Sequence, residues 1–291
     1  MLAELFSIVA PVLVCAGLGF GWAKSGRKFD TDMVMTLVTN IGVPCLVFST
    51  LVQADIEAKA LATMAGATAA VVVAVGVLGA GALKLTGQPV RPFLPSLMFP
   101  NVGNMGLPLC LLAFGDIGLA LGIAVFTVMV VIQFVVSPII AGGITSPLEL
   151  ARIPILYAVA ASLVVILGHL EPWAWIVNTT KILGGMVIPL MLTTLGISLA
   201  RLRVVGLARA AGIAVLRVGL GFGIGLAVAT GLDLEGAAKG VLVLQSSLPV
   251  AVFNFLFAER YQTRPTDVAG AVVVSTLLSF AALPALLWFL L

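Results

Sequence analysis

Residues 99–109 read FPNVGNMGLPL and could build a binding site for a polar solute inside a membrane. Proline removes a backbone donor and glycine loosens a helix, so this run predicts a helix interrupted midway through an apolar segment. Unwound backbone at that depth must be buried in protein or face a wet cavity. Alone, the run also fits a kinked structural helix whose asparagines bond a neighbour. The residues expected to break the helix are Pro100, Gly103, Gly106 and Pro108.

A second polar interruption, QSSLPVAVFN, covers residues 245–254. It holds the corresponding position in the second half of the chain, and paired interruptions of this kind indicate a transport site between two repeats. Pairing therefore favours the binding site over the structural kink. The candidate binding residues are Asn101, Asn104, Gln245, Ser246, Ser247 and Asn254, with Asn40 also expected in the cavity wall, and further helix breaks are expected at Pro249, Pro44 and Pro189.

The composition, 61% hydrophobic and 9% charged, is that of an integral membrane protein. We expect an all-α fold in a single membrane domain, residues 1–291, that contacts lipid on its outer surface. Ten apolar segments can be drawn: 4–24, 31–53, 59–83, 92–114, 117–141, 150–168, 172–200, 206–231, 236–258 and 266–290.

The loops between these segments sort by charge. One side carries only Lys59 and Lys239, and two further cations, Lys181 and Arg217, fall inside segments. By the positive-inside rule the other, strongly basic side is cytoplasmic, so with ten spans both termini lie outside. The cations of the basic side are Lys24, Arg27, Lys28, Lys84, Arg91, Arg152, Arg201, Arg203, Arg209, Arg260 and Arg264.

Landmarks recur along the chain at a nearly constant offset of 143–146 residues. This predicts two five-helix repeats, residues 1–146 and 147–291. Because five is odd, the second repeat must enter the membrane from the opposite face, which makes the repeats inverted. The matched positions are Pro11 with Pro154, Pro44 with Pro189, Asn104 with Pro249, and Pro138 with Pro284.

The strings PNVGNMGLPL and QSSLPVAVFNFLFAERY, together with the segments around Pro44 and Pro189, resemble the auxin efflux carrier family. The family contains plant auxin exporters and bacterial permeases for small carboxylates, within the bile-acid symporter-like superfamily. The short loop from Gly142 to Arg152 resembles the bacterial members, which implies a multi-pass protein of the bacterial inner membrane.

The resemblance also implies an architecture and a mechanism. Segments one, two, six and seven would form a scaffold, and the other six a transport domain in which the broken fourth and ninth segments cross. A homodimer and an elevator-like motion would follow, with Asn101 contacting the substrate carboxylate. Ile155 stands where plant members carry a further asparagine, and this departure leaves the substrate open.

Chemically, a dehydrated organic anion needs donors in place of water. Half-helices starting near Met105 and Val250 would aim their positive ends at it. We expect Asn101 and Gln245 to lead the anion contacts, because neutral donors also let the anion leave. A small carboxylate such as malonate or malate is expected; an aromatic acid of the auxin kind is the alternative.

The charged residues leave energy coupling open. Lys181 could snorkel to the surface or face the cavity. Arg217 could snorkel, or pair near Glu259, in a structural role. A proton carrier needs a titratable carboxylate within the membrane, and none lies near the breaks. Sodium coupling, as in bile-acid symporters, and uncoupled or exchange transport fit as well, so the choice between proton coupling, sodium coupling and neither stays open.

Other classes of protein fit the sequence less well. An intramembrane enzyme would need clustered carboxylates, a metal set or a Ser/His pair, and one peripheral histidine supplies none of these. Cys15, Cys45 and Cys110 lack metal-ligand spacing, so no catalytic residue, metal or cofactor is expected. Nothing indicates nucleic-acid binding. A membrane sensor or scaffold without transport remains the alternative of another class.

Overall fold

The computed structural model describes residues 2–54, 56–142 and 152–291, and this part of the chain is helical. Its extended pairing is limited to one isolated bridge. Within the described residues, seven helical stretches are long and apolar enough to cross a membrane, and Pro154–Leu167 is a shorter apolar helix. The loop expected between the two halves, at residues 143–151, lies outside the described residues.

In the first half, the helical elements differ in length and several follow one another without a loop. The π-helical turns, in which the helix is locally widened, are labelled η. The elements are α1 (Leu2–Lys24), α2 (Thr31–Leu37), η1 (Val38–Gly42), α3 (Val43–Gln53), α4 (Ala58–Leu85), α5 (Val90–Met98), η2 (Val102–Gly106) and α6 (Leu107–Ile140).

In the second half, the helices again include short pieces. They are α8 (Pro154–Leu167), α9 (Ala174–Gly185), α10 (Val187–Arg201), α11 (Leu207–Gly231), α12 (Gly236–Ser246), α13 (Val252–Arg260) and α14 (Pro265–Leu290).

The seven long stretches differ from the ten expected segments for local reasons. Segment 92–114 is split at residues 99–101 and then joins the next segment in α6, with only a kink at Gly115 (φ 66°, ψ −157°) between them. A glycine is needed there because this backbone conformation is closed to residues with a Cβ. Segment 236–258 is likewise divided between α12 and α13.

Prolines stand at or near most other irregularities. Pro44 and Pro108 lie in the first turn of α3 and α6, directly after η1 and η2, so each removes a backbone donor where the helix is locally widened. Pro189 lies inside α10, three residues after the break at Met186 that separates α9 from α10.

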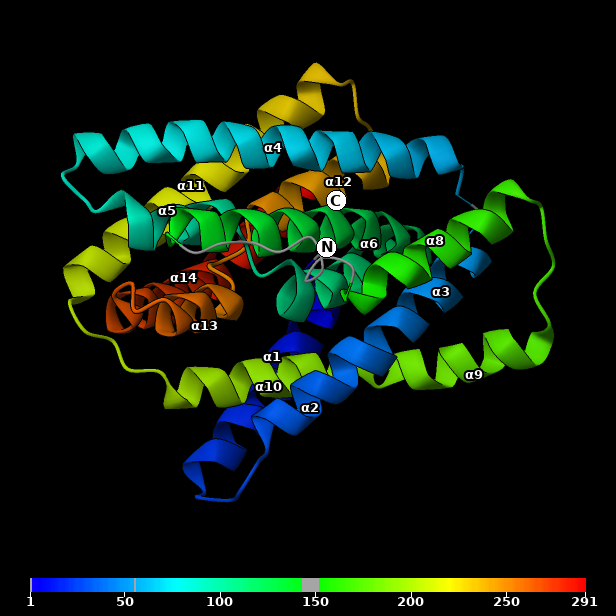
Figure 1. Cartoon of the computed structure of the whole chain (residues 1–291), viewed down its shortest axis with the longest axis horizontal. Coiled ribbons are helices and arrows are strands. Elements are labelled where there is room, and N and C mark those ends of the chain that lie inside the picture. The colour runs from blue at the N-terminus through cyan, green and yellow to red at the C-terminus, as the bar shows by residue number, and fades with distance from the viewer. Residues whose placement is uncertain (1, 55, 143–151) are drawn as a thin grey trace.

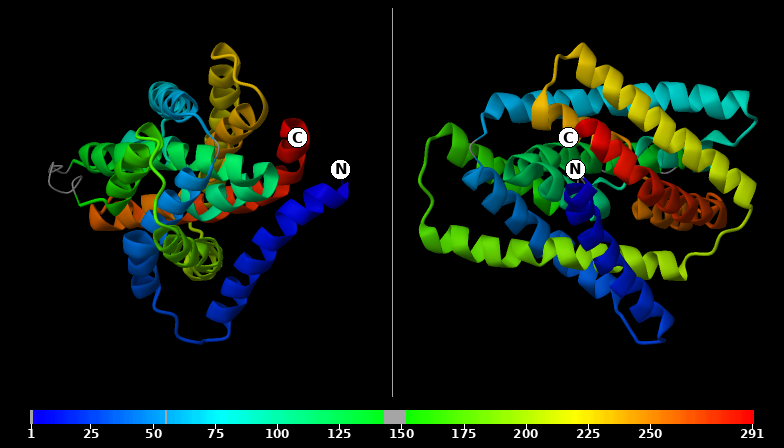
Figure 2. Two further views of the ribbon diagram at one scale, coloured as in Figure 1. Left: turned by 90° about the vertical axis from the view of Figure 1, so that its right-hand side faces the viewer. Right: turned by 180° about the vertical axis from the view of Figure 1, so that it is seen from behind.

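The helices pack in two groups, each drawn from both halves of the chain (Figure 1). In the first group, α1 packs on α10, and α3 packs on α8 and α9. In the second, α11 packs on α14, α12 and α4, and α6 packs on α4 and α12. Contacts between the groups are fewer. The outer ends of α1 and α14 lie near each other, so both chain ends are on one side (Figure 2).

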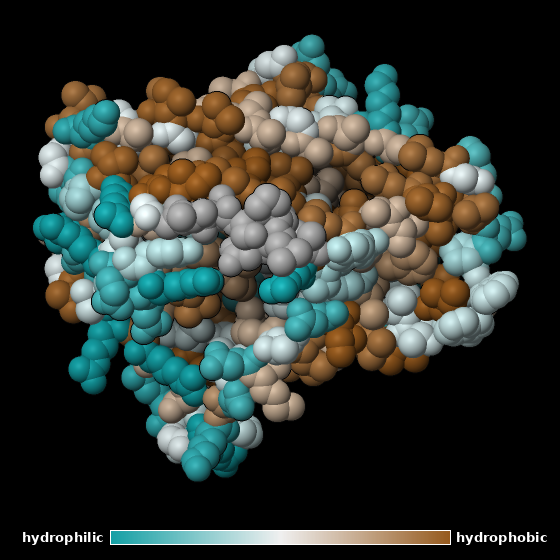
Figure 3. Space-filling model, in the orientation of Figure 1, coloured by the Kyte–Doolittle hydropathy of each residue, from teal (hydrophilic) through white to brown (hydrophobic). Residues whose placement is uncertain are grey.

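The surface has the character expected of a protein in lipid. Hydrophobic residues cover the face over α4, whereas hydrophilic residues gather toward the left and lower left of the view, near α2 and the loops that enter α11 and α14 (Figure 3). Those loops belong to the strongly basic side of the chain.

Two glycines allow α1 and α10 to approach until their backbones touch. A Cβ on Gly19 would overlap the Thr193 carbonyl, and a Cβ on Gly196 would overlap the Ala16 carbonyl. Small residues at such a contact are a common basis of helix association in membranes. By contrast, a Cβ on Gly17 or Gly21 would have no atom within 4 Å.

This contact predicts a sharp difference between neighbouring glycines. Gly196→Val should destabilise the protein by about 1–3 kcal/mol or more, because the added side chain must push a backbone away. Gly17→Val is the matched control and should change stability by less than about 0.5 kcal/mol. Thermal unfolding of both variants in detergent measures the difference, and equal midpoints would contradict the packing described.

Candidate functional site

Two extended segments cross between the broken helices. After α5, residues Phe99–Asn101 run antiparallel to residues Pro249–Ala251, which follow α12, with Pro100 opposite Val250. The Asn101 N–H donates to the Pro249 carbonyl (2.8 Å), and the Ala251 N–H donates to the Phe99 carbonyl (3.2 Å). Exchanging each residue with the one 150 positions away interchanges these two bonds. The sequence matched Asn104 with Pro249, an offset of 145, whereas the two-fold relation of the crossing pairs Pro100 with Val250, an offset of 150.

Side chains make further hydrogen bonds to the backbone groups of the crossing. Pro100 has no N–H, and the Val250 N–H donates to the Ser275 hydroxyl of α14 (3.0 Å). The Asn254 amide donates to the Phe99 carbonyl (2.9 Å) and accepts a bond from Gln133 Nε2 (2.9 Å). These bonds replace the water that unwound backbone would need.

The crossing also places the positive N-terminal ends of the half-helices on one side and the negative C-terminal ends on the other. The chain enters η2 at Val102 and α13 at Val252, so the N-terminal, positive ends of two half-helices begin directly after the crossing. Helix starts expected near Met105 and Val250 thus lie at Val102 and Val252. The C-terminal, negative ends of α5 and α12 arrive from the other side.

A cavity of about 890 Å³ lies against the first turns of these half-helices. Residues 100–104 and 251–253 line its inner end, so the helix N-termini face the space directly. Its other walls come from α2, α8 and α10 of the first group and from α6 and α13 of the second. The cavity therefore lies along the boundary between the two groups.

The mouth of the cavity is basic. Arg152, Arg201 and Arg260 line it together with one carboxylate, Asp32. Arg201 is fixed by bonds from its guanidinium to the Thr31 hydroxyl (2.9 Å) and to the Phe29 carbonyl (3.1 Å). All three arginines belong to loops or helix ends on the basic side of the chain, so the cavity opens toward that side.

Two buried donors of the cavity lining have no partner in the described structure. Asn101 is 4% exposed with its Nδ2 unbonded, and Thr194 of α10 is 3% exposed with its hydroxyl unbonded. Buried polar atoms are normally paired, so each unbonded atom needs a reason. Both residues line the cavity, so a solute bound there is the candidate partner.

Thr194 is a residue that sequence reasoning missed. The next residue along the chain shows why, since Thr193 looks identical in sequence but bonds the Pro189 carbonyl within its own helix (2.8 Å). Only the rotation of α10 relative to the crossing separates the two threonines. In the sequence, the helix break expected at Pro189 was the one signal that α10 could contribute to the cavity wall.

Of the other predicted residues, Asn40 and Asn104 line the cavity, while Asn254 lies behind the lining. Gln245 does not reach it. Its Nε2 donates to the Gly122 carbonyl (3.1 Å) and to Cys110 Sγ (3.3 Å), so the side chain is packed inside the second group.

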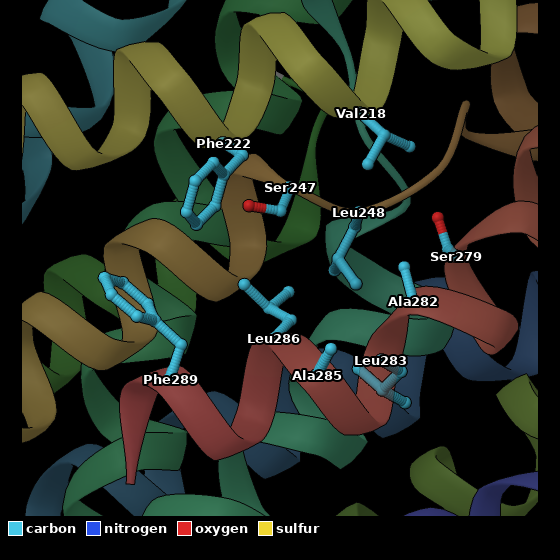
Figure 4. Close-up of a pocket in the computed structure, with 10 residues that line it drawn as sticks. All are labelled: Val218, Phe222, Ser247, Leu248, Ser279, Ala282, Leu283, Ala285, Leu286 and Phe289. Atoms are coloured by element: carbon cyan, nitrogen blue, oxygen red, sulfur yellow. The ribbon is translucent and has the colours of Figure 1, made fainter.

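Ser246 and Ser247 also face away from the large cavity. Ser246 is fully buried against α11, where a Cβ added to Gly225 would lie 2.7 Å from the Cβ of Ser246. Ser247 bonds the Val243 carbonyl (2.6 Å) and borders a smaller apolar pocket of about 360 Å³. Figure 4 shows side chains of α11 and α14 on opposite sides of this pocket, with Ser247 and Leu248 between them.

The three charged candidates have different environments. Lys181 and Glu259 are exposed and do not line the cavity. Arg217 is 1% exposed, so it neither snorkels to the surface nor pairs near Glu259. Its guanidinium instead donates to the carbonyls of Leu97, Ser246 and Leu248.

A helical membrane protein with crossed, broken helices and a cavity at their N-termini has the form of a transporter. The model of the family described as membrane transport protein matches residues 5–141 and 143–289. The chain belongs to this family. A comparison with curated proteins finds no match.

Membership in the membrane transport protein family confirms the resemblance to auxin efflux carriers. The family consists of transporters and not of enzymes, and its members are multi-pass membrane proteins. Nearly the whole chain is matched, so the cavity, the crossing and Arg217 all lie within the family's own domain.

The amide pair that supports the crossing predicts an energetic coupling. Gln133→Met and Asn254→Leu keep the volume of each side chain but remove the bond between them. The two changes together should differ from the sum of the single effects by about 0.5–3 kcal/mol, because both residues belong to one hydrogen-bond network. Unfolding free energies of the four proteins in detergent give this term.

A control cycle pairs Asn254→Leu with Thr180→Val, whose hydroxyl bonds only within α9. These effects should add within about 0.5 kcal/mol. Additivity in the first cycle would mean that the bond between Gln133 and Asn254 does not help to hold the crossing.

Proposed function

We propose that this protein is a secondary transporter that carries a small organic anion, a carboxylate, across the bacterial inner membrane. The observation that supports this most is the inner end of the cavity. There, the N-termini of two half-helices meet unbonded donors from Asn101 and Thr194. Both features favour a negatively charged solute, and helix N-termini bind anions through free N–H groups and the helix dipole.

The absence of a cation from this inner end suits a carrier. The arginines of the cavity lie at its mouth, whereas the described residues at its inner end are neutral amides, hydroxyls and apolar groups. A carboxylate held by neutral donors is bound less tightly than one held by a guanidinium fork. The substrate can therefore be released on the far side at a useful rate.

The basic mouth would serve a separate purpose. Three arginines and one aspartate leave a net positive charge at the entrance, and such a field concentrates anions and speeds their arrival. By the positive-inside rule this entrance faces the cytoplasm, with both termini on the opposite side. The structure then represents an inward-facing state.

The two packing groups suggest how access could alternate. The first group would be a fixed scaffold and the second would carry the crossing through the membrane as an elevator. The cavity separates the groups along part of their boundary, so less packing would have to be broken there for them to move. Pairing of two scaffolds in a homodimer would hold the fixed part against the membrane.

The lining of the outer cavity supports an alternative substrate, an aromatic acid of the auxin kind. Ile155, which is buried in the wall where the plant pattern has an amide, counts against the binding mode of the plant members. Aromatic side chains could hold a ring by stacking and edge contacts. They are Phe126, Phe134, Phe253, Phe255, Phe257 and Tyr261.

A thermal-shift panel on purified protein tests the proposal. Small carboxylates and indole acids are compared, and a true ligand should raise the melting temperature because it binds the folded state. Asn101→Ala and Thr194→Val should each weaken that ligand about ten- to a hundredfold, since a hydrogen bond to a charged group contributes about 1.5–3 kcal/mol.

Thr193→Val is the matched control, because its hydroxyl is bonded within α10 and does not line the cavity. Its ligand affinity should equal that of the unmodified protein. A panel without any shift, from protein shown to be folded, would contradict the anion carrier and favour a sensor or scaffold. A shift that survives in both site variants would place the ligand elsewhere.

A further inference from the structure

Arg217 of α11 holds the two broken helices together from behind the crossing. Its Nε donates to the Leu248 carbonyl (3.2 Å), one Nη to the Leu97 carbonyl (2.6 Å), and the other Nη to the Ser246 carbonyl. Leu97 is in the last turn of α5, and Ser246 is the last residue of α12. One side chain thus collects carbonyls from both interrupted helices.

The charge of Arg217 is balanced by backbone dipoles and not by an acid. Within the described residues, the recorded ion pairs join Asp267 to Arg209 and Arg264, and none includes Arg217. The C-terminal ends of two half-helices each carry a partial negative charge, and cations are favoured there. At membrane depth an ionised side chain needs such partners to be tolerated.

The packing around the guanidinium shows that the site is built for close approach. A Cβ on Gly221 would overlap the Ser246 carbonyl and would lie 3.1 Å from a guanidinium nitrogen. Gly221 therefore lets α11 reach the end of α12. Arg217 does not line the large cavity, so a substrate there would not touch it.

In cation-coupled carriers, carbonyls of unwound backbone and the C-terminal ends of half-helices are the groups that coordinate sodium. Here three such carbonyls converge on a side chain. We propose that Arg217 takes the place of a coupling sodium ion, so that transport needs no Na⁺, and that removing the guanidinium opens a site for a monovalent cation. The inference rests on the proposed transport function for its meaning, but its primary test needs no substrate.

The first experiment measures the stability of Arg217→Ala in detergent. Three chloride salts are compared, those of sodium, guanidinium and choline. Guanidinium is used at millimolar concentration, and all three solutions have the same ionic strength. The variant should melt well below the unmodified protein in choline and should recover several degrees in guanidinium and in sodium, because a free cation binds the folded state. The unmodified protein should melt at one temperature in all three salts.

Arg209→Ala is the control on the same helix. Arg209 is an exposed arginine that pairs with Asp267 (3.1 Å), so its removal deletes the same side chain without opening a buried carbonyl site. It should show no preference for sodium or guanidinium over choline. An equal response in both variants would be a general salt effect and would overturn the inference.

Arg217→Lys is the second variant and keeps a charge without the planar fork that reaches three acceptors. It should be less stable than the unmodified protein but insensitive to the choice of cation. With a ligand from the carboxylate panel, Arg217→Ala should bind more tightly in sodium than in choline, while the unmodified protein should not distinguish them.

Either of two results would refute the inference. One is an Arg217→Ala protein that stays unfolded in every salt, or whose melting temperature does not depend on the cation. The guanidinium would then have a structural role that no free ion can replace. The other is sodium-dependent ligand binding in the unmodified protein, which would place a sodium site elsewhere. Neither result would disprove anion transport, which the Asn101 and Thr194 variants test separately.

Discussion

The structure depends on one constraint, that no backbone donor or acceptor can be left bare at the middle of a membrane. Two helices are interrupted there, and their loose ends are satisfied mainly by each other across the Pro100–Val250 bridge. Proline removes one donor, a serine hydroxyl takes another, and an amide pair takes a carbonyl. Gln133, Asn254 and Ser275 are thereby committed to holding the crossing, whereas Asn101 Nδ2 is left unbonded.

The crossing also separates charge without a single carboxylate. Positive helix ends point into the cavity and negative ends point at a guanidinium on the opposite side. The field is therefore built from fixed peptide dipoles, which need no counter-ion to be carried along. For the anion proposed above, this part of the attraction would not depend on the protonation state of the surrounding loops.

The sequence predicted which stretches would be irregular, because proline, glycine and asparagine have strong local effects on a helix. It predicted that two polar breaks meet, since their positions in the two halves correspond. It could not predict which polar side chains face the cavity. Gln245 was expected at the site but is packed inside the second group, and Thr194 was not expected but lines the cavity. Helix rotation decides between a buried contact and a cavity wall, and adjacent residues such as Thr193 and Thr194 give no sign of it.

For Arg217, too, the sequence could not reveal the contacts that the side chain makes. Its type and depth marked it as unusual, but its partners are main-chain carbonyls brought together from residues 97, 246 and 248, which no pattern of side chains reveals. An expected acidic partner was wrong because dipoles had taken that role. Periodicity likewise could not show where a segment is divided or joined to the next, since kinked and divided helices such as α6 and α12 keep the same apolar pattern as straight ones.

The contact of Gly19 and Gly196 joins the first helix of the chain to a helix of the second half, backbone against backbone. The helices α4, α5 and α6 pack on one another and also on α11, α12 and α14 of the second half. Neither half of the chain therefore holds a finished body. During synthesis, α1 must wait in the membrane for α10 to be made, and the last steps of assembly must follow the insertion of the final helices. During biogenesis, packing surfaces of the first half are therefore exposed to lipid until the helices that cover them have been synthesised.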